Sequence, residues 1–407
     1  MVKFGRQADR LSPDPIMKKR THKFLSVCAS LGLLFGAVAP LHATPITPTR
    51  DDEVIEVLPA MSGNRAEERR LRKQLAQAPR DAALALNVAQ RYLDQAHELG
   101  DPRFAGMAMS AIEGWTDEST MPDGVLMMRA NLQQYLHAFD ASARSLQKLL
   151  ARPSAQPRPQ AWLTLATVRR VQGRYVDSDA ACKQVAQAGA ALHANACMAE
   201  NAALRGDVDR ARATFGGLLA TPSLPGATRA WLTTSLAELE QRAGRASAAD
   251  VAFRASLKLE ADVYATLAYA DFLIEQKRPR EALVLLKEQA RSDAVVLRLA
   301  IAGVQAKSAT AAADVAEMRE RIKLANERPD AKLFHGREQA MFALFVENDA
   351  PRALELARGN VAQQREPLDL LVLAQAARAS GQAAALQEAQ RITQETGLRD
   401  ARVQALL

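Results

Sequence analysis

The sequence predicts an all-α fold in which a pair of helices repeats along most of the chain. Apolar residues make up 48% of the 407 residues and aromatic residues only 5%. Alanine and leucine dominate and β-branched runs are few, which favours helices over strands. Small residues also recur in apolar-periodic stretches at intervals of 36, 33, 38 and 33 residues. A period of this length is typical of solenoids, in which each unit is one supersecondary element.

Each unit has a first apolar-periodic stretch, a turn, and a second stretch in which a small residue precedes a second packing residue by four positions. The second stretches carry Ser142-x3-Leu146, Ser178-x3-Cys182, Ala211-x3-Phe215, Ala249-x3-Phe253, Ala282-x3-Leu286 and Ala353-x3-Ala357. The gap of 71 residues between Ala282 and Ala353 fits two units, one of them degenerate. This spacing predicts helices that pack closely at the small positions.

Glycines mark the turns between the two stretches of a unit. Gly173 and Gly206 interrupt otherwise helical patterns, and glycine tolerates the positive φ with which a chain leaves a helix. The equivalent turn at Lys277-Arg278-Pro279 lacks glycine, but proline is favoured at the first position of a helix. We therefore expect antiparallel helices on either side of each turn.

This pattern resembles the tetratricopeptide repeat (TPR), whose period is about 34 residues. Trp162-x2-Leu165 resembles the start of the family's first helix, Gly206-Asp207 its turn, and Ala211-x3-Phe215 its second helix. The resemblance covers residues 81–397. It implies a TPR-like superhelix: a right-handed α-solenoid of about nine antiparallel helix pairs, each burying its apolar face against its neighbours.

The N-terminal 43 residues have the features of a signal peptide. Lys18, Lys19 and Arg20 precede an apolar stretch over residues 24–39, and Ala43 is a small residue suited to cleavage. The stretch is shorter than the roughly 20 residues that a spanning helix needs. We expect cleavage after Ala43, no stable transmembrane anchor, and a periplasmic or secreted protein. Because these features begin at Met17, we expect the true start there.

The segments that flank the repeats carry different patterns. Residues 44–80 contain Pro45, Pro48 and Pro59, which predict a linker followed by a lead-in helix. Residues 398–407 are interpreted as a C-terminal tail. The first 43 residues hold seven of the 53 basic and two of the 46 acidic side chains, so the remainder has a net charge near +2. A nucleic-acid partner would need a basic face, and we expect none.

No catalytic motif accompanies the repeats. The sequence lacks HExxH, GxSxG, Walker-type and GxGxxG patterns. His97, His137, His193 and His335 fall in different units, so we expect no metal site and no cofactor. The repeats also leave no segment of domain size for chemistry. The favoured interpretation is a non-enzymatic scaffold; the alternatives are an enzyme or enzyme component of cell-wall metabolism and a structural subunit of an envelope complex.

The resemblance implies that the first helix of each pair lines a concave groove that holds a protein or an extended peptide. Ten residues of mixed charge map to this side: Asn131, Gln134, Thr167, Arg170, Glu200, Trp231, Glu238, Arg242, Tyr264 and Asp271. They do not match the Lys/Asn/Arg carboxylate clamp of chaperone-cofactor repeats. For Trp231 two roles stay open, packing at the start of its helix or contact with the ligand.

Cys182 and Cys197 lie on two helices that the repeat pattern makes neighbours. Two thiols in an oxidising compartment tend to pair, and bridging needs Cα atoms about 4.4–6.8 Å apart. Free cysteine is also a common buried residue. The sequence therefore leaves two outcomes, a disulfide or two buried side chains that never meet.

Overall fold

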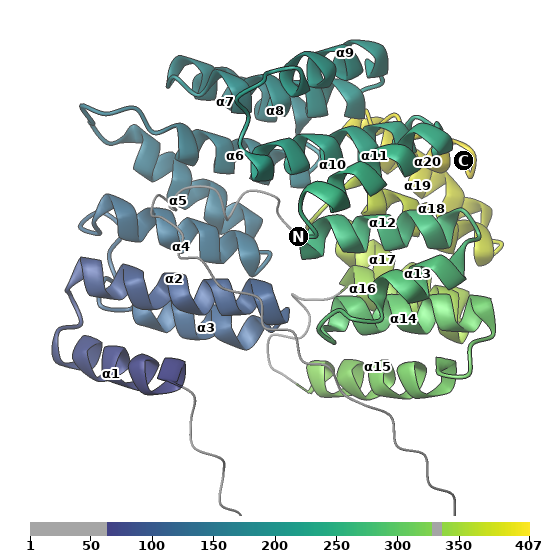
Figure 1. Cartoon of the computed structure of the whole chain (residues 1–407), viewed down its shortest axis with the longest axis horizontal. Coiled ribbons are helices and arrows are strands. Elements are labelled where there is room, and N and C mark those ends of the chain that lie inside the picture. The colour runs from purple at the N-terminus through teal and green to yellow at the C-terminus, as the bar shows by residue number, and fades with distance from the viewer. Residues whose placement is uncertain (1–62, 328–335) are drawn as a thin grey trace, which may run out of the picture. The chain divides into compact units, whose positions relative to one another are not determined.

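The structure, a computed structural model, describes residues 63–327 and 336–407 (Figure 1). The predicted signal peptide of residues 1–43, the start at Met17, the proline-containing part of the linker and His335 all lie outside the described residues. Residues 71–407 form one compact unit. The predicted lead-in helix is present as α1 (Gly63–Gln77).

Nine helix pairs follow α1 in the part of the chain that the structure describes, with no strand among them. The pairs are α2 (Ala82–Leu99) with α3 (Pro102–Ala111), α4 (Asp123–Tyr135) with α5 (Phe139–Ala151), α6 (Pro159–Val171) with α7 (Tyr175–Gln187), α8 (Ala191–Leu204) with α9 (Val208–Leu219), α10 (Gly226–Arg242) with α11 (Ala246–Leu259), α12 (Val263–Glu275) with α13 (Pro279–Leu286), α14 (Asp293–Ala306) with α15 (Ala311–Asn326), α16 (Gly336–Phe342, continued by the π-helical turn Ala343–Glu347) with α17 (Ala350–Val361), and α18 (Pro367–Ala379) with α19 (Ala383–Thr396). The predicted solenoid of helix pairs is confirmed.

A residue with positive φ stands in the turn of every pair. Glycine fills five of the nine positions and other residues fill four: Gly100, His137, Gly173, Gly206, Gly244, Lys277, Lys307, Asn348 and Gly381. A left-handed residue directly after a helix lets the chain reverse while its amide bonds the last helical carbonyls. The turn at Lys277 therefore has the same backbone as the glycine turns, with φ of 59°.

Small residues sit where two helices of a pair cross. The side chains of Ala166, Ala211 and Ala249 are fully buried. Ser178, which takes the position of Ala211 and Ala249 in its own pair, is fully buried as well. The Ser178 hydroxyl donates to the Ala166 carbonyl oxygen at 2.8 Å, so the polar group is satisfied inside the core. Close approach of the helices explains why small side chains recur at this position.

The degenerate unit is the pair α14 and α15. In α15 the small residue is replaced by Asp314, and Met318 follows four positions later; both side chains are buried. Arg291 donates to the Asp314 carboxylate at 2.8 Å, which compensates for the burial of the charge. The helix therefore packs like the others although its sequence hides the pattern.

Residues 398–407 are not the loose tail that the sequence suggested. They include the short helix α20 (Ala401–Gln404), and Leu398, Asp400 and Val403 are 2%, 0% and 0% exposed. A β-carbon placed at Gly244, in the turn between α10 and α11, would lie 3.5 Å from Cβ of Ala401, and Arg402 donates to Glu275 at the end of α12 at 3.0 Å. The Arg399 amide donates to the Leu204 carbonyl oxygen at 2.8 Å, so this segment packs on a much earlier part of the array.

Candidate binding surfaces

Polar side chains join successive first helices across one face of the array. Arg170 on α6 places its Nη1 atom 2.7 Å from Oε2 of Glu200 on α8. Ser235 on α10 donates to the other oxygen of Glu200 at 2.9 Å. The side chains of Arg170 and Glu200 are only 14% and 7% exposed. Two predicted groove residues, Arg170 and Glu200, and one that was not predicted, Ser235, thus form one connected chain of contacts over α6, α8 and α10.

The same chain of contacts continues toward α14. The Tyr264 hydroxyl on α12 donates to the Glu238 carboxylate on α10. Burial, with the Glu238 carboxylate beside it, raises the pKa of Tyr264 well above its usual value. Arg298 on α14 donates to Asp271 on α12 at 2.6 Å. We call the contacts from Arg170 to Arg298 the polar ladder; they link five successive first helices.

Not every predicted groove residue is placed for contact with a ligand. Thr167 is 3% exposed, and its hydroxyl donates to the Leu163 carbonyl of its own helix at 3.0 Å. Trp231 is 9% exposed, packs in a core cluster with Phe215, and stacks on His193 at 5.7 Å between ring centroids. The structure therefore gives Thr167 and Trp231 packing roles, which corrects the prediction that Thr167 faces the groove.

Three other polar groups near this face are buried without a hydrogen-bond acceptor in the part of the chain that the structure describes: Gln134 Nε2, Tyr175 Oη and Arg242 Nε. Gln134 and Tyr175 are 6% and 2% exposed. Burial raises the pKa of Tyr175 even though the guanidinium groups of Arg242 and Arg170 act on its phenol in the opposite sense. A buried donor without an acceptor costs free energy. Asn131, three positions before Gln134 on α4, is half-buried.

Cys182 on α7 and Cys197 on α8 are joined by a disulfide, with Cα atoms 5.9 Å apart. Both side chains are fully buried. The bond ties the second helix of one pair to the first helix of the next. The amide of Asn201 lies at 3.7 Å from the Cys182 sulfur and donates to Ser178 at 2.9 Å, so the surrounding polar groups are ordered as well.

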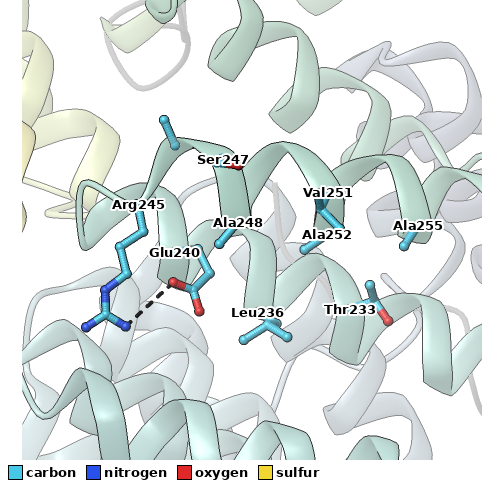
Figure 2. A pocket seen from close by; sticks show the side chains of 10 residues that line it. Thr233, Leu236, Glu240, Arg245, Ser247, Ala248, Val251, Ala252 and Ala255 are labelled. Atoms are coloured by element: carbon cyan, nitrogen blue, oxygen red, sulfur yellow. Dashed lines mark ion pairs between the residues drawn. The ribbon is translucent and has the colours of Figure 1, made fainter.

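A second concave surface lies between α10 and α11 and is shown in Figure 2. It has a volume of about 770 Å³, and its floor is formed by Leu236 and Thr233 of α10. Ala248, Val251 and Ala252 of α11 line its side, and Val251 is 66% exposed. We call this surface the alanine groove. Sequence reasoning missed it, although the alanine-rich stretch of residues 246–255 is a visible signal.

One end of the alanine groove is closed by charges. Arg245 reaches Glu240 at 3.9 Å, the ion pair drawn in Figure 2, and Arg212 of α9 donates to the same carboxylate at 2.5 Å. Glu240 is therefore bound by two guanidinium groups, one from α9 and one from the turn before α11.

The described residues contain no cluster of three or more His, Cys, Asp or Glu side chains that could hold a metal ion. None of the helices in residues 63–327 and 336–407 combines the length and apolar character of a membrane span.

The repeated pair, the left-handed residue in each turn and the small residue at each crossing define the architecture. The fold is a TPR-like solenoid. No family model matches the sequence, and no curated protein matches it. Solved structures similar to the chain include YrrB and a Rap protein. YrrB, described as a TPR protein with an unusual peptide-binding site, shares 15% identity over 48% of this chain and 94% of its own, with a TM-score of 0.30.

The second is a Rap protein complexed with competence and sporulation factor. It shares 12% identity over 84% of this chain and 91% of its own, with a TM-score of 0.47.

Proposed function

We propose that this protein is a non-enzymatic scaffold that binds an extended peptide or a protein segment along the polar ladder. The observation that carries the proposal is the set of buried donors without acceptors, Gln134 Nε2, Tyr175 Oη and Arg242 Nε. An extended peptide presents one main-chain carbonyl oxygen per residue and is rich in acceptors. Its binding would supply the hydrogen bonds that these donors lack within the described chain.

The charges of the ladder support the same class of ligand. Arg170 is paired with Glu200, and Asp271 is paired with Arg298, so these charges largely neutralise each other. Arg242 is half-buried and has no ion-pair partner among the described residues. A surface with paired charges and one remaining guanidinium favours a mostly neutral main chain with an occasional carboxylate over a polyanion such as nucleic acid.

An enzyme with a site in the groove is the less supported alternative. A general acid needs a carboxyl group in an apolar, closed pocket. The alanine groove is apolar, but its one carboxylate, Glu240, is bound to Arg212 and Arg245. The alanine groove favours instead the second candidate function, a structural subunit of an envelope complex whose second helices face another protein. Val284 on α13 is 77% exposed and adds apolar surface to that side.

We further propose that the protein works in the periplasm or outside the cell. The basic and apolar N-terminal pattern supports this location, and so does the closeness of the two cysteines. Mass spectrometry of the mature N-terminus tests it: a chain that begins at Thr44 is expected, and a chain that retains Met17 contradicts cleavage.

Affinity capture from an envelope extract, with cross-linking, tests the scaffold function. Arg242→Ala is expected to reduce capture at least tenfold without loss of helical content. Arg210→Ala is the matched control, because Arg210 has a side chain 81% exposed on α9, away from the first helices. Equal capture by wild type and Arg242→Ala would remove the ladder as the binding surface, and capture of no protein would favour the enzyme interpretation.

A further inference from the structure

The last residue of α19 and the segment that follows it run across the turns of consecutive helix pairs. A β-carbon placed at Gly173 would lie 2.7 Å from Cγ2 of Thr396, and one at Gly206 would lie 3.1 Å from Cγ of Arg399. At Gly244 the nearest atom is Cβ of Ala401, at 3.5 Å. The segment therefore meets three successive turns in order. Three extended residues span about 10 Å, close to the 8–10 Å between packed helices.

Main-chain hydrogen bonds from this segment and from the loop before α18 cap the ends of two first helices. The last carbonyls of an α-helix have no donor within the helix. Leu204 is the last residue of α8, and its carbonyl accepts the Arg399 amide at 2.8 Å. Val171 is the last residue of α6, and its carbonyl accepts the amide of Arg365, in the loop before α18, at 2.7 Å. Later helix pairs thus cap two earlier helices.

Arg402 extends the contact to α12. Its Nη1 atom donates at 3.0 Å to Glu275, the last residue of α12, which also accepts from Gln241 of α10 at 2.9 Å. The same guanidinium pairs with Asp400, whose side chain is fully buried, at 2.6 Å. One arginine therefore connects the segment to two first helices and holds a buried carboxylate in place.

The segment is joined to α19 through a single left-handed glycine, Gly397, with φ of 72°. Gly397 is exposed, and no atom lies within 4 Å of a β-carbon placed on it. The Arg399 amide, the Arg402 guanidinium and the buried Leu398 and Val403 hold the part of the segment that follows Gly397. A rotation at Gly397 would release these contacts together, whereas Thr396 and the Arg365 bond lie before the glycine and stay in place.

We propose that residues 396–402 form a clasp that holds α6, α8, α10 and α12 at one curvature, and that rotation about Gly397 opens its later part, which holds α8, α10 and α12. The polar ladder runs across the same four helices, so opening the clasp changes the distance between ladder residues. The clasp thereby regulates access to the ladder, a role that rests on the proposed binding function. The locking of the array itself does not depend on any ligand.

An engineered disulfide tests the placement of the clasp. Gly244→Cys with Ala401→Cys brings two Cβ atoms to about the separation of a disulfide, and we expect a cross-link by peptide mapping. Gly381→Cys with Ala401→Cys is the matched control: Gly381 has a similar φ of 69°, but no atom lies within 4 Å of its β-carbon. The control must stay uncross-linked. Absence of the cross-link from the first variant overturns the proposal.

Hydrogen exchange then tests whether the clasp opens. The cross-linked variant is compared with Gly244→Cys/Ala401→Ser, which has the same altered turn without the bond, so no reductant threatens the native disulfide. We expect amide exchange in the last turns of α8 and α10 to be at least tenfold slower in the cross-linked protein. Equal exchange in the two variants means that the segment never opens, and the clasp is refuted.

Capture from envelope extract separates this proposal from the scaffold function. Lower capture by the cross-linked variant than by Gly244→Cys/Ala401→Ser supports regulation by the clasp. Equal, substantial capture by both refutes regulation but leaves the scaffold function standing. If the wild type and both variants capture no protein, the scaffold function is refuted, and regulation by the clasp is refuted with it. Hydrogen exchange then decides separately whether the clasp locks the array.

Discussion

Substituting alanine for glycine at two turns measures the contact between the clasp and the array. Gly173 and Gly381 both have left-handed backbones, with φ of 73° and 69°. An L-residue there costs roughly 1–2 kcal/mol, and the loss of glycine entropy in the unfolded chain returns about 0.4–1 kcal/mol. Gly381→Ala should therefore reduce the free energy of unfolding by about 0.5–1 kcal/mol.

Gly173→Ala adds a steric cost that Gly381→Ala lacks. Its methyl group would lie 2.7 Å from Cγ2 of Thr396 and 3.2 Å from Cβ of Arg365, whereas nothing lies within 4 Å at Gly381. Overpacking of this kind typically costs 1–3 kcal/mol. The total for Gly173→Ala is then about 2–4 kcal/mol, and part of it is relieved if Thr396 moves away.

Urea unfolding followed by circular dichroism provides the comparison. Both variants should unfold at lower urea concentration than the wild type, with Gly173→Ala clearly the less stable. If Gly173→Ala is no more destabilised than Gly381→Ala, then residues 365 and 396 do not lie on the turn of α6 and α7, and the reasoning about the clasp is wrong.

Three further predictions concern single sites. Thiol titration of unfolded, unreduced protein should find no free thiol, because Cys182 and Cys197 are bridged; two free thiols would contradict this. The two cysteines are 15 positions apart, so removal of the bond should lower the free energy of unfolding by about 3 kcal/mol. Burial lowers the pKa of His193 in the folded protein below its usual value of about 6.5. The neutral imidazole therefore contributes to stability above about pH 6.5, and this contribution is lost as the pH falls through the lower folded pKa. Fluorescence of the stacked Trp231 should fall with a midpoint below 6.5 and lose this transition in His193→Gln; a midpoint at or above 6.5 would disagree. Lys277→Gly should raise stability by about 0.5 kcal/mol, because glycine relieves the left-handed backbone; a loss measured by thermal melting would show that the lysine side chain contributes.

The helix pairs were predictable because their packing is local. A small residue at each crossing and a packing residue four positions later recur at nearly constant spacing, so the sequence displays the period. The pair α14 and α15 hid its period because Asp314 replaces the small residue and depends on Arg291, which lies on the preceding connection. Residue type alone does not report such compensation by a distant charge.

The binding surface was only partly predictable. Helical spacing predicts which side of the first helices lines the groove. The pairing of Arg170 with Glu200, in contrast, depends on the rotation between neighbouring helix pairs. Thr167 was misplaced because helical spacing does not show which positions at the edge of the groove face the neighbouring helices cover, and its side chain is buried. The clasp was invisible because the Arg399 hydrogen bond to Leu204 is made by main-chain atoms, which every residue except proline can supply.

The ion pair between Arg402 and Glu275 joins positions 127 residues apart and has a consequence for how this protein can evolve. Open repeat arrays gain and lose units readily, because each unit contacts only its neighbours. Here, duplication or deletion of one pair between α12 and α19 would carry Arg402 and Arg399 past Glu275 and Leu204, and both contacts would be lost. Repeat number between these points is therefore constrained by geometry, and homologues should vary in length before α6 more freely than after it.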